Sequence, residues 1–175
     1  FTRLRAKYPN LRLTIAGTAH TRFPGYAREL KNHFNGARGI QWLGQVAEED
    51  VRSLFQRARV VVLPYTASTG SSSVLYQAAT WGRAVVASDL SETRKLALEA
   101  NLQVQFFENN NLLSLYNSIC LLLDSPSLRR AQAQHNFNTI QHLRPKATAS
   151  RYVQAFNRAL EKRSSTKRIP LLESA

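Results

Sequence analysis

The chain has 175 residues, which is enough for one domain with its own hydrophobic core. Its 43% hydrophobic and 20% charged residues are typical of a globular protein, and no apolar run reaches the roughly 18 residues of a membrane-spanning helix, so a transmembrane protein is excluded. The net charge of +13 attracts phosphates, nucleic acid or anionic lipid without choosing among them.

Two short strands and two helices are predicted in the first third of the chain. Residues 10–17 alternate apolar and polar and end in small residues, as a buried strand closing at a tight turn does. Residues 40–44 form a second such strand, also ending in glycine. Helical patterns are predicted at residues 26–34 and 47–58, the second with an apolar stripe and three acidic residues in its first turn.

Three more strands follow, at residues 60–65, 84–88 and 102–107. The first of them, VVVLPY, is continuously apolar and β-branched, which indicates a strand covered on both faces, as in a parallel sheet. Strand and helix therefore alternate five times with short connections. This order predicts an α/β, three-layer, doubly wound parallel sheet of the Rossmann-like kind, whose ligands bind beyond the carboxyl ends of the strands.

From about Asn109 the predicted elements are all helices, separated by breaks at Pro126 and Pro145. We expect residues 1–163 to form the domain and residues 164–175, which are polar and show no period, to form a flexible tail. The chain does not begin with Met, so we expect it to be a fragment of a larger, two-domain enzyme.

The segment after strand 60–65 is rich in hydroxyl groups. TASTGSSS, residues 66–73, holds six Ser and Thr and precedes a helix in which Val74, Leu75, Ala78 and Ala79 are expected to pack inward. Gly70 lets the backbone approach a ligand, and the first amides of a helix bind anions. A phosphate or diphosphate fits this loop. The alternative is an ordinary capped helix on a polar surface loop.

Other sequence features give weaker signals. Cys120 lies in an apolar run and is expected to be a small buried hydrophobe, which suggests a reducing compartment. The four histidines show no ligand spacing, so we expect no metal and no cofactor. His20 is either a surface histidine or part of a cleft at the end of the first strand. Glu92 is either a first-turn helix glutamate or a site residue.

A family resemblance emerges from four segments in order: LTIAG, IQWLGQVAEEDVRSLFQRARVVVLPY, YQAATWGRAVVAS and LLLDSPSLRR. The chain resembles the carboxyl-terminal, donor-binding half of group 1 glycosyltransferases, the retaining family 4 enzymes with the GT-B fold. The resemblance covers Asn10 to about Lys162. It implies binding of a nucleoside diphosphate sugar.

The resemblance also implies the positions of the donor site. The loop after the second strand would meet the nucleotide base, and the start of the hydroxyl-loop helix would meet the diphosphate. The residues implied are Gly17, Thr18, Leu43, Gly44, Gln45, Val46, Thr69, Gly70, Ser71, Ser72, Ser73, Val74 and Gln77.

The sequence departs from the family pattern at two points. The family carries two glutamates eight positions apart, and the matching positions here are Thr69 and Gln77. Because neither side chain carries a negative charge, the roles that need one are lost, and no catalytic residue is assigned. The family's opening strand, with the Arg and Lys that neutralise the diphosphate, would precede Phe1.

The predicted function is hexosyl transfer from a nucleoside diphosphate sugar to a glycan or lipid-linked acceptor, as in polysaccharide biosynthesis. We expect the intact enzyme to be active, with an N-terminal acceptor-binding domain of the same protein as partner, and this chain alone to be inactive. The alternative is a catalytically weakened, basic binding module that docks on a membrane or nucleic acid. The expected location is cytoplasmic, with peripheral contact to the inner face of the membrane; nucleic acid is the less expected partner.

Overall fold

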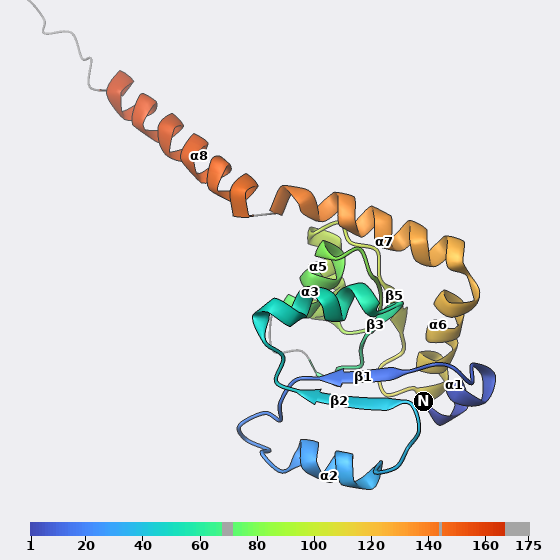
Figure 1. Ribbon diagram of the computed structural model, residues 1–175. Coiled ribbons are helices and arrows are strands. Elements are labelled where there is room, and N and C mark those ends of the chain that lie inside the picture. Colours follow the sequence, from blue (N-terminus) through green and yellow to red (C-terminus); the bar gives the residue numbers. More distant parts are fainter. Residues whose placement is uncertain (68–71, 144, 167–175) are drawn as a thin grey trace, which may run out of the picture.

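A computed structural model describes residues 1–67, 72–143 and 145–166 (Figure 1). Helices and strands alternate through the first two thirds, and helices alone follow. In chain order the elements are α1 (Thr2–Lys7), β1 (Leu13–Ala16), α2 (Tyr26–His33), β2 (Ile40–Gly44), α3 (Glu48–Arg57), β3 (Val60–Leu63), α4 (Ser73–Thr80), β4 (Ala84–Ser88), α5 (Ser91–Glu99), β5 (Gln105–Phe107), α6 (Leu112–Asp124), α7 (Pro126–Ile140), a 3-10 turn η1 (Gln141–Leu143) and α8 (Pro145–Thr166).

The larger sheet has the strand order β3-β4-β5, and both strand pairs are parallel. Its central strand, β4, is buried along its whole length. Side chains alternate between the two faces of the sheet. Val85 and Ala87 pack with the cluster that includes residues of α3, α4 and α5, whereas Ala84 and Val86 pack with Leu122 of α6. The three-layer α/β architecture predicted from the sequence is confirmed.

The smaller sheet consists of β1 and β2, which are also parallel. One face carries Leu13, Ile15, Ile40 and Trp42, and these side chains line a cavity of about 440 Å³ together with residues of α1 and α2. The opposite face of both strands is exposed.

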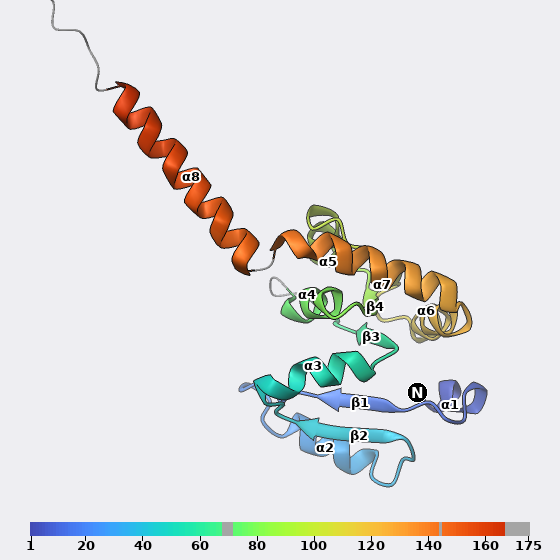
Figure 2. The ribbon, with the colours of Figure 1, turned by 45° about the horizontal axis from the view of Figure 1, so that its top comes forward.

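The strands therefore divide into two hydrogen-bonded groups, where the sequence predicts one sheet. β2 connects to β3 through α3, which Figure 2 shows on the side of β1 that faces β3. The two groups separate between β1 and β3. In a doubly wound sheet of the common order 3-2-1-4-5-6, strand 1 stands between strands 2 and 4, and the gap between β1 and β3 corresponds to that position. Here the edges of β1 and β3 are not paired with each other.

Two buried amide side chains connect α7 to the larger sheet. Gln132 Oε1 accepts a hydrogen bond from the backbone N–H of Val85 at 2.8 Å. One turn further on, Asn136 accepts from the N–H of Gln103 at 2.7 Å and donates to the carbonyl of the same residue at 2.8 Å. α7 thus satisfies backbone groups of β4 and of the segment before β5 that the strand ladder leaves unpaired.

α1 is joined to the end of α6 by a polar contact. Asp124 accepts hydrogen bonds from Lys7 Nζ at 2.7 Å and from the Tyr8 hydroxyl at 2.6 Å. The hydrogen bond from Lys7, followed by that from Tyr8, lowers the pKa of Asp124. Burial, followed by the hydrogen bond to Asp124, raises the pKa of Tyr8 to about 12.

Asp124→Asn should therefore lower the melting temperature near neutral pH. A carboxylate with a lowered folded pKa contributes stability above its unfolded pKa of about 4 and loses that contribution as pH falls through the folded value. The difference in melting temperature between wild type and variant should shrink toward zero in acid. Glu99→Gln, which removes a carboxylate 3.9 Å from Lys95, is the control with a smaller expected effect. A difference that stays constant with pH would contradict this assignment.

The carboxyl-terminal helix α8 extends away from the domain body (Figures 1 and 2). It runs to Thr166, so the first three residues of the predicted tail are helical and the expected boundary at Arg163 lies inside the helix. Ser and Thr have only slightly unfavourable helix propensity, so an exposed helix can continue through them. Residues 167–175 lie outside the described residues. None of the described helices is long and apolar enough to cross a membrane.

Candidate functional site

The carboxyl ends of β1 and β2 meet at two glycines. The N–H of Gly17 donates to the carbonyl of Gly44 at 2.7 Å, which closes the strand pair at this edge. Gly17 has φ +120° and Gly44 has φ +65°, conformations that favour glycine over other residues, and a Cβ at either position would meet nothing within 4 Å. Open space therefore borders the backbone where the sequence predicts a ligand.

Most of the neighbouring residues predicted for the donor site are accessible at the same edge. Thr18, Leu43 and Gln45 are exposed, and Val46 is half-buried. The described structure therefore brings Gly17, Thr18 and residues 43–46 together at the carboxyl ends of β1 and β2.

The helix α4 begins directly after the hydroxyl loop, beyond the carboxyl end of β3. Ser72 is its N-cap, and its Oγ accepts a hydrogen bond from the N–H of Leu75 at 3.3 Å. This is the ordinary capping role that the sequence left as an alternative. The hydroxyl can still donate its own proton, so capping and ligand binding are compatible at Ser72.

Ser73 and Gln77 lie on one face of α4, because residues four apart are neighbours on a helix surface. Ser73 is exposed, while Val74 and Gln77 are half-buried. Ser72 takes up the N–H of Leu75, whereas the N–H groups of Ser73 and Val74 have no partner within the helix, and the helix dipole adds partial positive charge there. The other predicted residues of this loop, Thr69, Gly70 and Ser71, lie outside the described residues.

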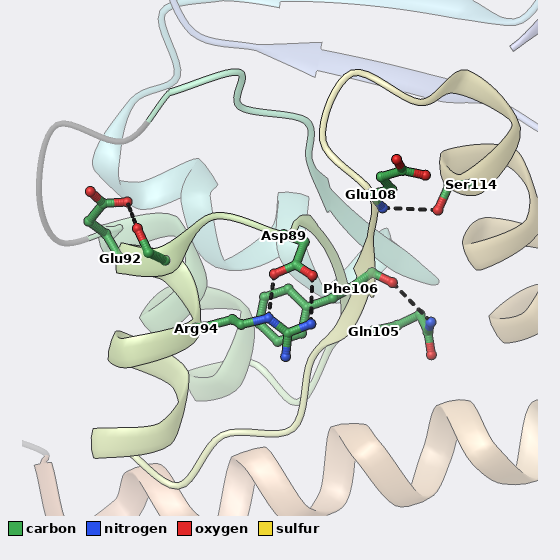
Figure 3. A network of polar contacts seen from close by, with 8 residues as sticks. Asp89, Glu92, Arg94, Gln105, Phe106, Glu108 and Ser114 are labelled. Carbon is green, nitrogen blue, oxygen red and sulfur yellow. Dashed lines mark hydrogen bonds and ion pairs between the residues drawn. The ribbon is translucent and has the colours of Figure 1, made fainter.

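An ion pair that the sequence analysis did not anticipate lies immediately after β4. Asp89 receives two hydrogen bonds from the guanidinium of Arg94 on α5, one of them at 2.6 Å (Figure 3). Arg94 also stacks over the ring of Phe106 at 4.6 Å. The hydrogen bond from Arg94 lowers the pKa of Asp89. The carboxylate of Asp89, just after the end of β4, is thus neutralised by the guanidinium of Arg94.

Glu92, in the first turn of α5, is exposed and accepts a hydrogen bond from the Ser91 hydroxyl at 3.0 Å. Its own backbone N–H, followed by Ser91, lowers its pKa, so it stays a carboxylate near neutral pH. Figure 3 shows Glu92 near the start of α5, apart from the pair that Asp89 forms with Arg94. The first-turn role proposed from the sequence is present; a role in a site stays a prediction.

Asn109 is a second residue that sequence reasoning missed. It follows β5, and its Nδ2 donates to the carbonyl of Thr66, the first hydroxyl-loop residue, at 3.1 Å. Its Oδ1 is buried and has no hydrogen-bond partner among the described residues. The signal available in the sequence is position alone, since Asp89 directly follows one predicted strand and Asn109 lies two residues after the next.

The predicted donor-site residues belong to the ends of two different sheets. Gly17, Thr18 and residues 43–46 lie at the carboxyl ends of the smaller sheet's strands. Residues 72–77 come after β3 of the larger sheet. The 440 Å³ cavity is lined by neither group. His20 is exposed and accepts a hydrogen bond at Nδ1 from the N–H of Arg22. In the part of the chain that the structure describes, no group of three His, Cys, Asp or Glu residues could hold a metal ion.

Comparison with known families gives the chain its class. The sequence profile described as "Glycosyl transferases group 1" matches residues 1–125, well over half of the chain. The chain belongs to the group 1 glycosyl transferases. This group 1 assignment confirms the resemblance that the sequence motifs indicated and favours a transferase over the binding-module alternative. A search of curated protein sequences finds no match.

Solved structures of glycosyltransferases share the fold. HepE of Anabaena in complex with UDP matches with a TM-score of 0.70 and 17% identity over 85% of this chain and 41% of its own. Sucrose-phosphate synthase of Thermosynechococcus elongatus matches with a TM-score of 0.70 and 18% identity over 91% and 41%. The C-terminal domain of the group 1 protein LpcC of Francisella tularensis gives 0.64 and 18% over 78% and 71%.

At these identities the likeness shows the fold, which is that of GT-B glycosyltransferases. The chain spans about two fifths of the length of HepE and of the sucrose-phosphate synthase.

Proposed function

We propose that this chain is the donor-binding half of a hexosyltransferase and holds a nucleoside diphosphate sugar at the carboxyl ends of its strands. The observation that carries the proposal is the start of α4, where Ser72 caps an eight-residue helix that follows β3 beyond its carboxyl end. Free amides, the helix dipole and uncharged hydroxyls combine there into a binding surface for a diphosphate. A related protein, HepE, has been crystallised with UDP and with UDP-glucose, which supports the same donor class here.

The base would contact Leu43 to Val46, and Gln77 would hydrogen-bond a ribose or sugar hydroxyl. The acceptor, a glycan or lipid-linked molecule, would be held by an N-terminal domain of the same protein. Catalysis in the intact enzyme would consist mainly of stabilising the departing nucleoside diphosphate through the amides of α4. This chain alone supplies the donor side and would transfer no sugar. Contact with a membrane at the cytoplasmic face belongs to the same proposal.

The proposal predicts that charge at position 72 controls donor binding. Asp and Asn are equally good helix N-caps, so Ser72→Asp and Ser72→Asn should retain the stability of α4. Only Asp adds a negative charge beside the diphosphate, and two like charges about 4 Å apart repel by roughly 4 kcal/mol at an effective dielectric constant of 20. Titration with UDP, GDP and ADP sugars by calorimetry should show at least a tenfold weaker affinity for Ser72→Asp than for Ser72→Asn.

Thermal unfolding of both variants is the control for helix integrity. Equal donor affinity in the two variants would show that the diphosphate does not bind at the start of α4. Failure of the wild-type chain to bind any of the three donors at millimolar concentration, together with failure of the intact protein, would overturn the donor-binding function itself.

A further inference from the structure

Asp89 presents a fixed carboxylate just after the central strand β4. The guanidinium of Arg94 donates a hydrogen bond to each of its two oxygens, one of them at 2.6 Å. Arg94 is held in turn against the ring of Phe106, 4.6 Å from the ring centroid. The backbone N–H of Asp89 donates to the carbonyl of Phe107 at 2.8 Å. Backbone and side chain are therefore both held, and the carboxylate is oriented in the absence of a ligand.

The carboxylate of Asp89 can accept further hydrogen bonds. A carboxylate offers about four lone-pair positions, and the two hydrogen bonds from Arg94 use two of them. The side chain is 37% exposed, so the remaining positions are open to a ligand. The hydrogen bond from Arg94 lowers the pKa of Asp89, which keeps the group ionised near neutral pH. A ligand group that meets this carboxylate must therefore donate hydrogen bonds.

The position of Asp89 along the sheet edge shows which part of a donor it would meet. The ends of the three strands are level, because Leu63 of β3 pairs with Ala87 of β4, and Ser88 of β4 pairs with Phe107 of β5. Figure 2 shows β3 between the smaller sheet and β4. The order along this edge is therefore the smaller sheet, then β3, which leads to α4, and then β4, which leads to Asp89.

A nucleoside diphosphate sugar lying along this edge would bring its sugar to the end of β4. The proposed function places the base at residues 43–46 and the diphosphate at the start of α4. The next strand is about 4.8 Å further on, a distance that a hexose ring spans. Ionised phosphate oxygens only accept hydrogen bonds, whereas sugar hydroxyl groups donate them. Because Arg94 neutralises Asp89, the carboxylate can lie beside a diphosphate with little repulsion.

From these observations we infer that Asp89 recognises the sugar of the donor. Its carboxylate, oriented by Arg94, accepts hydrogen bonds from one or two hydroxyl groups of the sugar. The inference rests on the proposed donor binding and adds to it a residue that determines which sugar is accepted. A site that hydrogen-bonds a hydroxyl group discriminates against a sugar that lacks it, because the buried acceptor then loses its partner.

The test measures the affinity of the full 175-residue chain and of the intact protein for deoxygenated donors by calorimetry. The parent ligand is whichever of UDP-glucose, GDP-glucose and ADP-glucose the wild type binds most tightly. Its analogues each lack one hydroxyl group of the glucose, and the nucleoside diphosphate without sugar is the reference. A hydrogen bond to a charged group has a large effect, so at least one analogue should bind the wild type about tenfold more weakly than the parent.

Asp89→Asn should reduce this discrimination to less than about threefold and change the affinity for the nucleoside diphosphate alone by less than about twofold. Asp89→Glu, which keeps the charge but moves the carboxylate by one methylene group, should also reduce the discrimination. Glu99→Gln is the matched control, because it removes a carboxylate 3.9 Å from Lys95 at the other end of α5. It should keep the discrimination of the wild type. Circular dichroism and thermal unfolding show whether each variant keeps the fold.

Three outcomes would overturn the inference while leaving the proposed donor binding intact. The first is that the wild type binds every deoxygenated analogue as tightly as the parent donor. The second is that the Asp89 variants discriminate as the wild type does. The third is that Glu99→Gln loses discrimination to the same extent as Asp89→Asn, which would assign the effect to general charge. Failure of the wild type to bind any of the three glucose donors would instead overturn the donor-binding function, and this inference with it.

Discussion

Asn136→Ala is expected to lower the free energy of unfolding by about 2–4 kcal/mol. The wild-type side chain is completely buried and pairs with both the N–H and the carbonyl of Gln103. Alanine leaves the two backbone groups without partners at the boundary of the core, and each unsatisfied group costs about 1–3 kcal/mol. Urea denaturation followed by circular dichroism measures the difference.

Gln134→Ala on the same helix is the matched control. Gln134 is exposed and bonds only to the neighbouring Asn138 side chain, so its loss should change the free energy of unfolding by less than about 0.5 kcal/mol. Equal effects of the two substitutions would mean that the Asn136 hydrogen bonds contribute no net stability.

Asn136 and Gln132 also show what the sequence could not predict. Both are amides in a helix with many polar residues, and nothing in the sequence of α7 distinguishes them from exposed Gln134 or Asn138. The strand pairing between β4 and β5 begins only at Val86 and Gln105, so the backbone groups of Val85 and Gln103 have no partner in that pairing. The two amides are buried where they hydrogen-bond to these groups. Such a role depends on where two distant elements meet, which a local pattern does not contain.

Local patterns predicted the strands and most helices of the domain, although the short first helix α1 was missed. The apolar run at β4 and the stripe that includes Val51 and Phe55 in α3 fix both the element type and the buried side, because period and burial are coupled. The division into two sheets was not predicted. Strand pairing between β1 and β3 is a long-range relation, and the sequence indicates only that each is a strand.

The candidate site was predicted in part. Glycines at the ends of β1 and β2 and the hydroxyl-rich start of α4 could be identified because strand ends and helix caps have local sequence signals. The role of Ser72 as the actual N-cap, among several adjacent hydroxyls, required the structure. Asp89 and Asn109 were missed, because a single polar residue after a strand has the sequence appearance of an ordinary turn.

Leu75→Ala is expected to lower the free energy of unfolding by about 2–5 kcal/mol. Leu75 is 0% exposed and packs in the cluster that joins α4 to Leu63 of β3 and Val85 of β4. The substitution removes buried apolar surface and leaves a cavity directly beneath the first turn of α4. Chemical denaturation measures the loss, and Leu98→Ala, which truncates a side chain that is 83% exposed, should change stability by less than about 0.5 kcal/mol.

The same substitution tests how the core supports the proposed diphosphate surface. The amides of α4 can bind an anion only while the helix is held at the end of β3, and Leu75 is the buried residue of the first turn of that helix. If α4 binds the donor, Leu75→Ala should weaken affinity under conditions where the domain remains folded, whereas Leu98→Ala should leave it unchanged. Unchanged affinity in a destabilised but folded Leu75→Ala protein would show that donor binding does not depend on the packing of α4, and would place the diphosphate elsewhere along the strand ends.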